Sequence, residues 1–109
     1  MIPSTVRIFV CTEPQDMRRS FDGLALATRQ VLDQDPECGA LFCFINKRAN
    51  RLKVLWWDKN GYCLLYKRLH RAIFLLPTGG GADSSAIRID GRALADLIAG
   101  VEKKRRKRA

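Results

Sequence analysis

Residues 52–69, LKVLWWDKNGYCLLYKRL, decide the fold of this chain. Two runs rich in leucine, valine and aromatic residues flank the tetrapeptide DKNG at positions 58–61. A glycine after an asparagine is a strong turn signal, because both residues tolerate the positive φ angles of a tight hairpin turn. The stretch therefore predicts a β-hairpin, with one strand over residues 52–57 and the other over residues 62–69.

Two adjacent tryptophans, Trp56 and Trp57, lie in the first strand of this hairpin. Side chains alternate along a strand, so one ring faces each side of the sheet, and both sides need cover. One interpretation places both rings in the core. Another places one ring at a dimer contact or at a base-stacking surface. A register that sets Leu55 and Leu65 beside Trp57 favours the dimer contact over base stacking.

The hairpin also pairs basic residues. With Asn60-Gly61 as a two-residue loop, Lys53 lies opposite Arg68, and with one more residue in the turn it lies opposite Lys67. Either register sets like charges across the strand pair, which costs a fraction of a kcal/mol. A bound phosphate would remove that cost, and so would a nearby acid such as Asp58 or Asp16.

Further elements follow on both sides of the hairpin. Residues 6–11 (VRIFVC), 41–45 (LFCFI) and 72–76 predict strands, and a helix is expected to begin between Asp16 and Ser20 and to end at residues 35–39. Residues 78–85 (TGGGADSS) predict a flexible loop without P-loop character, and Asp90 caps a final helix. The class is therefore α+β: an antiparallel β-meander of about five strands, one helix after the first strand and one C-terminal helix.

Size and charge suggest one domain with a basic tail. The chain has 109 residues, 47% of them hydrophobic, and a net charge of +9. We expect one α+β domain over residues 1–101 and a basic, disordered tail over residues 102–109, which contains KKRRKR. Both parts are basic, so an acidic polymer is the expected partner type.

Several functional classes find no support in the sequence. The four cysteines form no C-x-x-C pair, and the single histidine, His70, lies beside an arginine without a neighbouring acid. We therefore expect no metal site, no cofactor and no enzymatic activity. The chain has no apolar run of about 18 residues and no signal-peptide pattern, so we expect a cytoplasmic protein that contacts no membrane.

Two segments in a fixed order resemble a known family. The first is DMRRSFDGL at residues 16–24, and the second begins with LKVLWWD at residues 52–58. With the GY, KRL and Pro77 positions that follow, they resemble the transposase-accessory TnpB (Orf2-like) family of the insertion-sequence sixty-six type. The resemblance implies a bacterial mobile-element protein that is encoded beside a larger transposase and supports transposition. It implies no catalytic residues.

The sequence thus favours a non-enzymatic accessory protein for the transposition of an insertion sequence. It would contact DNA at the element ends, or the transposase–DNA complex, and it could form a homodimer. The alternative is an adaptor that binds the cognate transposase without touching DNA. The residues assigned to nucleic-acid contact are all basic and lie at the expected start of the first helix, around the hairpin and in the tail: Arg18, Arg19, Lys47, Arg48, Arg51, Lys53, Lys67, Arg68, Arg71, Lys103, Lys104, Arg105, Arg106, Lys107 and Arg108.

Overall fold

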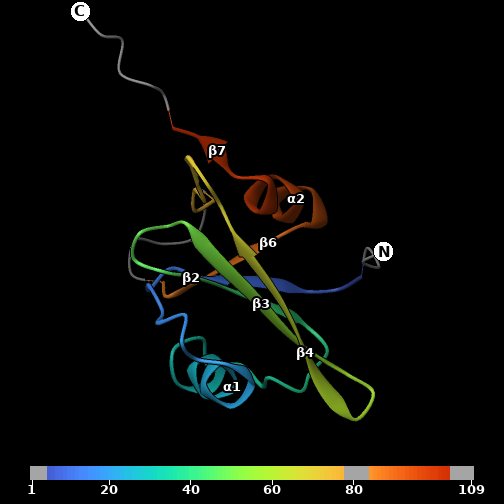
Figure 1. Cartoon of the computed structure of the whole chain (residues 1–109). Coiled ribbons are helices and arrows are strands. Elements are labelled where there is room, and N and C mark those ends of the chain that lie inside the picture. Colours follow the sequence, from blue (N-terminus) through green and yellow to red (C-terminus); the bar gives the residue numbers. More distant parts are fainter. Residues whose placement is uncertain (1–4, 78–83, 104–109) are drawn as a thin grey trace, which may run out of the picture.

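A computed structural model describes residues 5–77 and 84–103 (Figure 1). Within these ranges the chain forms a five-stranded sheet, a two-stranded sheet and two helices. The elements are β1 (Ile8–Cys11), α1 (Phe21–Gln30), β2 (Leu41–Ile45), β3 (Arg51–Asp58), β4 (Gly61–Arg68), β5 (Ala72–Ile73), β6 (Ala86–Ile89), α2 (Gly91–Ala99) and β7 (Val101–Glu102).

The main sheet has five strands in the order β4-β3-β2-β1-β6. The mixed α+β class, with a mostly antiparallel sheet and two helices, is confirmed. The meander is only partly present, because β1 and β2 run parallel and α1 forms the crossover between them. A parallel pair needs such a crossover, whereas β2, β3 and β4 follow one another through short antiparallel turns.

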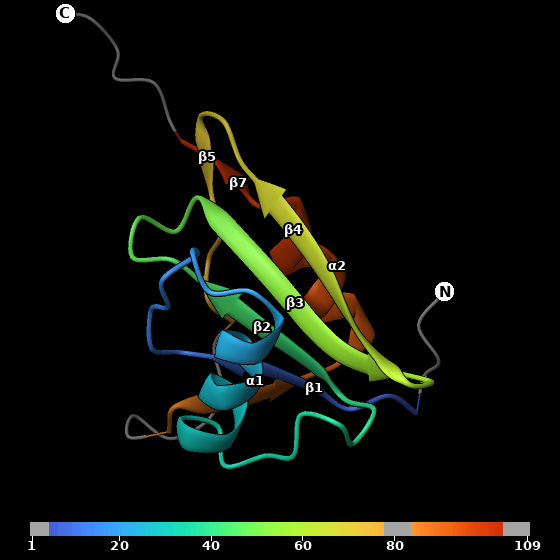
Figure 2. The same cartoon turned by 60° about the horizontal axis from the view of Figure 1, so that its bottom comes forward.

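The two helices cover opposite faces of the sheet, as Figure 2 shows with α1 in front of the strands and α2 behind them. Alternate residues of each strand enter different cores. Phe42, Phe44 and Leu55 pack with Leu24 of α1. The residues between them, including Cys43 and Val54, pack on the other side with the α2 leucines. Both faces of the strands are therefore buried, which explains why β2 is apolar at every position.

The helix starts follow the predicted cap residues. Ser20 is the N-cap of α1, and the carboxylate of Asp90 accepts a 2.8 Å hydrogen bond from the Ala93 N–H at the start of α2. The first helix ends earlier than expected, at Gln30. Leu32 nevertheless remains 4% exposed beyond that end, so its place in the apolar pattern reflects burial and not helical geometry. Neither helix of the described part is long and apolar enough to cross a membrane.

The hairpin β3–β4 is confirmed, but its register differs from both predicted alternatives. The two-residue loop is Lys59-Asn60, with φ angles of 31° and 70°. Lys53 therefore lies opposite Tyr66, and the like-charge pair across the strands is Arg51 with Arg68. The prediction failed by one residue because Lys59, which has no intrinsic preference for positive φ, takes the first loop position.

The tryptophans point to opposite faces, as predicted. Trp56 packs against the core beneath α2, and the Trp57 ring meets Tyr62 edge-on at 5.0 Å on the α1 side. Leu65 pairs with Val54 on the α2 side, whereas Leu55 lies beneath α1. The predicted register, which placed Leu65 with Leu55 and Trp57 on one face, is therefore wrong. A dimer contact at one of the tryptophans stays a prediction.

The C-terminal half also differs from the predicted strand list. Only Ala72 and Ile73 of the expected strand over residues 72–76 form β5, which pairs with β7 outside the main sheet. The fifth strand of the main sheet is β6, paired with β1. Its four residues are too few to stand out in a sequence pattern. Most of the predicted loop over residues 78–85 lies outside the described residues.

Candidate functional site: the open end of the β3–β4 hairpin

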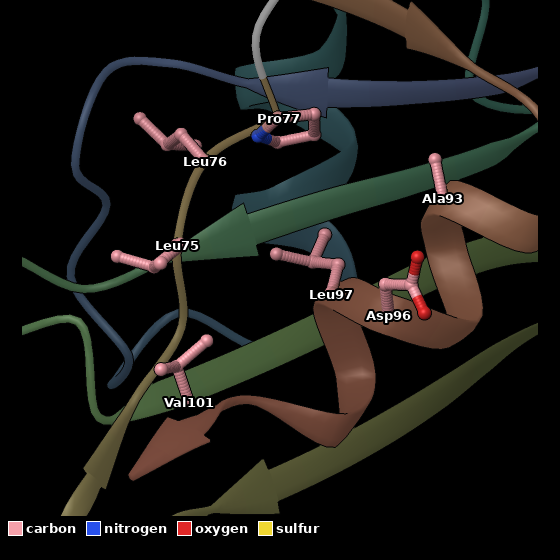
Figure 3. Close-up of a pocket in the computed structure, with 7 residues that line it drawn as sticks. All are labelled: Leu75, Leu76, Pro77, Ala93, Asp96, Leu97 and Val101. Carbon is pink, nitrogen blue, oxygen red and sulfur yellow. The ribbon is translucent and has the colours of Figure 1, made fainter. Parts of the chain in front are cut away.

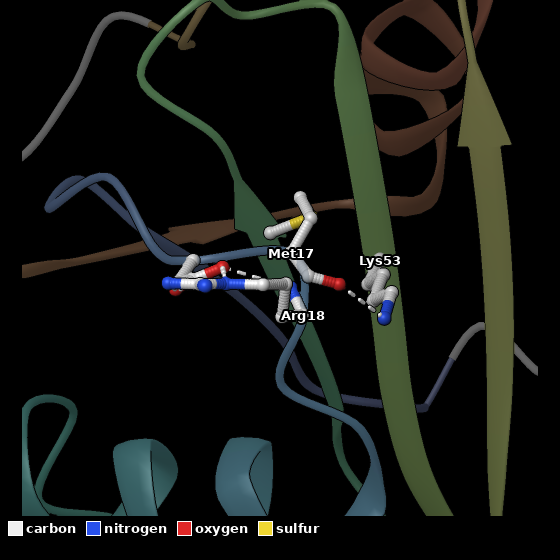
Figure 4. Close-up of polar contacts among 4 residues, drawn as sticks. Met17, Arg18 and Lys53 are labelled. Atoms are coloured by element: carbon white, nitrogen blue, oxygen red, sulfur yellow. Dashed lines mark hydrogen bonds and ion pairs between the residues drawn. The ribbon is translucent and has the colours of Figure 1, made fainter.

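Lys53 is the centre of a buried polar contact between the two sequence segments of the family resemblance. The residue is 6% exposed. Its Nζ donates hydrogen bonds to the carbonyl oxygens of Met17 at 2.7 Å and Arg19 at 2.8 Å, as Figure 4 shows in part. The ammonium also lies 4.7 Å from the centre of the Tyr66 ring. A buried charge needs such partners, so Lys53 holds residues 16–19 against β3.

Asp16 shapes the turn that offers these carbonyls. Its carboxylate accepts a hydrogen bond from the Arg18 N–H at 2.9 Å and forms an ion pair with the Arg18 guanidinium at 2.6 Å. Its carbonyl oxygen accepts from the Arg19 N–H at 3.1 Å. The hydrogen bonds from Arg18 lower the pKa of the Asp16 carboxyl to about 2. The acid therefore orders the turn, and the Arg18 side chain remains 91% exposed on the outer side.

Lys67 lies on the opposite face of the hairpin from Lys53. Its Nζ donates to the Ile98 carbonyl oxygen at 2.8 Å, in the last turn of α2. A cation at a helix C-terminus satisfies a free carbonyl and favours the helix dipole. Two of the ammonium groups predicted to contact nucleic acid thus donate hydrogen bonds within the fold instead.

Arg51 and Arg68 lie directly opposite each other where β3 begins and β4 ends. Arg51 Nη1 donates to the Tyr66 hydroxyl at 2.7 Å, and Arg68 Nη2 lies 3.5 Å from His70 Nε2. The two arginines and Tyr66 line a hollow of about 260 Å³. Within residues 5–77 and 84–103, neither guanidinium has a carboxylate within 4.0 Å. The hollow therefore offers hydrogen-bond donors and positive charge to an anion.

Backbone hydrogen bonds gather further basic residues at the same place. The 46–50 turn, which carries Lys47 and Arg48, is closed by the Asn46 side chain, which accepts from the N–H groups of residues 50 and 51. The Asn50 carbonyl accepts from the Leu69 N–H at 2.8 Å, and the Lys103 N–H donates to the carbonyl of Arg71 at 3.0 Å. We call this region the open end. It comprises Lys47, Arg48, Arg51, Tyr66, Arg68, His70, Arg71 and Lys103.

The other predicted contact residues lie in two places. Arg18 and Arg19 are exposed on the turn that Lys53 holds, on the same face of β3 as Arg51. The tail residues 104–108 lie outside the described residues.

Tyr66 was not among the residues predicted from the sequence. Its signal was its position two residues before Arg68 on the same face of a strand, which the wrong register concealed.

A second hollow, on α2, is mainly apolar (Figure 3). It has a volume of about 440 Å³, and one carboxylate, that of Asp96, is among the side chains that line it. The other lining residues are Leu75, Leu76, Pro77, Ala93, Leu97 and Val101. In the part of the chain that the structure describes, no three His, Cys, Asp or Glu residues gather as ligands for a metal ion.

Comparison with known proteins points to the same family as the two sequence segments that meet at Lys53. The model of the family described as IS66 Orf2 like protein, TnpB_IS66, matches residues 6–108. Two proteins of Sinorhizobium fredii (strain NBRC 101917 / NGR234) are similar over 94% of this chain, and both are named as uncharacterized. Protein y4hO is 39% identical, with 88% of its length covered, and protein y4jC is 35% identical, with 86% covered. No solved structure matches the chain. The chain belongs to the TnpB_IS66 family of IS66 Orf2-like proteins.

Proposed function

We propose that this protein supports transposition by contacting DNA, at the element ends or within the transposase–DNA complex, through the open end of the β3–β4 hairpin. Membership of the IS66 Orf2-like family implies an accessory role in transposition. The proposed DNA contact is non-enzymatic, because it requires only positive charge and hydrogen-bond donors.

The pairing of Arg51 with Arg68 is the observation that carries the proposal. Like charges directly opposite in a strand pair are destabilising, and here no acid in the described residues offsets them. A phosphate group would turn this cost into a favourable contact, because guanidinium groups bind phosphate through paired hydrogen bonds. Tyr66 holds one of the two guanidinium groups in place before any ligand arrives.

The surroundings support a phosphate backbone as the ligand. Lys47, Arg48 and Arg71 flank the arginine pair, and Lys103 begins the basic run KKRRKR. We propose that residues 102–109 act as a basic extension of the single domain and bind further phosphates. Contacts of this kind position a protein on DNA without reading its sequence.

A gel-shift titration with element-end DNA at several salt concentrations tests the proposal. The double variant Arg51→Ala/Arg68→Ala should weaken binding and should lower the slope of log K against log salt by about 1.8, since each lost phosphate contact removes about 0.9. The charge-matched control is Arg29→Ala/Arg92→Ala, on the two helices. If both double variants lose the same DNA affinity, the loss reflects only the change in net charge. If the full chain does not bind DNA at low salt, the proposed DNA contact is refuted.

An adaptor that binds the cognate transposase is the second candidate. It is favoured by three large apolar side chains beside the α2 hollow, Leu75, Leu76 and Val101, which are 52%, 44% and 47% exposed. Exposed apolar groups in one place are typical of protein contacts. Co-purification of the two proteins after nuclease treatment, and its loss in Leu75→Asp, would support this candidate. The control is Leu26→Asp, an equally exposed leucine on α1.

A further inference from the structure

Strand β4 is an open edge of the main sheet. It has eight residues, Gly61–Arg68, and it stands at the end of the strand order. The Leu69 N–H donates to the Asn50 carbonyl, which fixes the hydrogen-bonded positions of the β3–β4 ladder at every second residue. The backbone groups of residues 61, 63, 65 and 67 therefore face β3. Those of residues 62, 64, 66 and 68 face outward, where no strand of the described residues pairs with them.

This edge carries few of the features that keep strands from pairing with other chains. Its register runs without a bulge from Arg51 opposite Arg68 to Asp58 opposite Gly61, and it contains no proline. The charge of Lys67 is turned away to the Ile98 carbonyl. At the middle of the strand, Leu65 and Tyr66 are 38% and 48% exposed. The other edge strand, β6, has only four residues.

We propose that a second copy of this chain pairs with β4, antiparallel and about a two-fold axis at Leu65. The two-fold axis of such a pair is perpendicular to the sheet, and residues directly opposite each other point to the same face. The axis must therefore lie between one residue and the same residue of the second copy. An axis at Leu65 makes the longest overlap of the outward-facing groups. Tyr62 then exchanges hydrogen bonds with the partner's Arg68, and Leu64 with the partner's Tyr66. The two sheets become one continuous sheet.

Side-chain chemistry selects this register over its neighbours. With the axis at Leu65, the two Leu65 side chains meet on the α2 face. On the α1 face, Tyr62 lies opposite the partner's Arg68, an arrangement that suits a cation and a ring. An axis at Lys67 would instead set two ammonium groups against each other. The partner is thus a second copy, because in this register the edge sets apolar side chains against each other and places neither Lys67 nor Arg68 opposite another cation.

The dimer extends beyond the proposed DNA contact and does not depend on it. It does have a consequence for that contact, because both open ends lie on the same face of the joined sheet. The two Arg68 positions are separated by roughly 20 Å along the strand direction, from three residues on each side of the axis at about 3.4 Å per residue.

Sedimentation equilibrium of the full chain without DNA is the first test. The expected result is a concentration-dependent rise from 12.4 kDa to twice that mass. Leu65→Lys should raise the dimer dissociation constant by about tenfold or more, because it sets two like charges at the axis. Leu26→Lys, at an exposed leucine on α1, should leave it unchanged. A monomer at all concentrations, or equal dissociation constants for Leu65→Lys and the wild type, would overturn the proposal.

Disulfide cross-linking tests the register without relying on a destabilising variant. A cysteine at position 65 would face its symmetry mate at a non-hydrogen-bonded position, where opposite Cβ atoms come closest, at about 4.5 Å, which is within reach of a disulfide. In a Cys38→Ser/Cys63→Ser background, Leu65→Cys should give a covalent dimer on mild oxidation, and Leu26→Cys should not. Cross-linking that is absent for Leu65→Cys, or as fast for Leu26→Cys, contradicts the edge-to-edge pairing.

Discussion

Replacing Lys53 by methionine removes the buried ammonium while keeping a side chain of similar length. The variant loses two hydrogen bonds from a charged donor, to the Met17 and Arg19 carbonyl oxygens, and the contact with the Tyr66 ring. Hydrogen bonds to charged groups contribute about 1.5–3 kcal/mol each. The ring contact adds about 0.5–2 kcal/mol.

Two effects reduce that sum. Methionine avoids the cost of taking an ammonium out of water, and the two carbonyls at the protein surface can regain water if residues 16–19 move outward. We therefore expect Lys53→Met to lower the free energy of unfolding by about 2–4 kcal/mol, a loss typical of breaking a buried polar network. The melting temperature should fall by roughly 10–30 °C, given about 4–8 °C per kcal/mol for a domain of this size.

Urea and thermal unfolding followed by circular dichroism measure the loss. The control is Lys47→Met, which removes the same charge from an exposed turn and should stay within about 0.5 kcal/mol of the wild type. Hydrogen exchange adds a local readout, because the amides of residues 16–19 should exchange faster in Lys53→Met alone. If Lys53→Met is as stable as Lys47→Met, the buried ammonium does not hold residues 16–19 against β3.

Three further predictions concern charge and thiol chemistry. Folding lowers the pKa of the Asp16 carboxyl from 3.8 to about 2, so the stability that the carboxylate contributes is present above pH 4 and is lost as the pH falls toward 2. The unfolding curves of the wild type and Asp16→Asn should therefore differ at pH 6 and converge at pH 2. Identical curves at pH 6 would contradict the prediction. Arg68→Glu should raise stability slightly, by about 0.2–1 kcal/mol, because it gives Arg51 an opposite charge, yet it should weaken DNA binding in the gel shift; unchanged binding would remove Arg68 from the contact. Burial raises the pKa of the Cys43 thiol to about 12. Thiol labelling at pH 8 should therefore modify the exposed Cys38 and leave Cys43 unmodified until the chain is denatured. Equal labelling rates for the two cysteines would argue against the buried position of Cys43.

The sequence was sufficient for the elements whose signals are local. The hairpin followed from the turn signal at residues 58–61 and two apolar runs, although the loop itself is Lys59-Asn60, and the start of α2 followed from Asp90. The sheet order could not be predicted in the same way, because it depends on where α1 packs. A helix between two strands permits either an antiparallel or a parallel pair, and no residue pattern in the sequence selects the parallel pairing of β1 with β2.

The candidate site shows the same limit at the scale of single residues. Lys53 and Lys67 look like surface cations in the sequence, yet each donates to a backbone carbonyl far along the chain. The partners are carbonyl oxygens, which every residue has, so no sequence pattern marks them. The idea of a like-charge pair was sound, but a one-residue change in the turn moved it from Lys53 to Arg51. Moving a two-residue loop by one position shifts every cross-strand pair by two residues, so each side chain keeps its face and changes its partner.

Chemical-shift mapping by NMR, with element-end DNA added to the isotope-labelled full chain, tests the central claim most directly. Contact through the open end predicts that the largest shifts fall on the amide and side-chain signals of Arg51, Tyr66 and Arg68, and on the 46–50 turn beside them. The shifts should fade as salt is added, because the contacts are with phosphates. Shifts that gather instead around Leu75 and Val101, or that spread evenly over the surface, would contradict the claim.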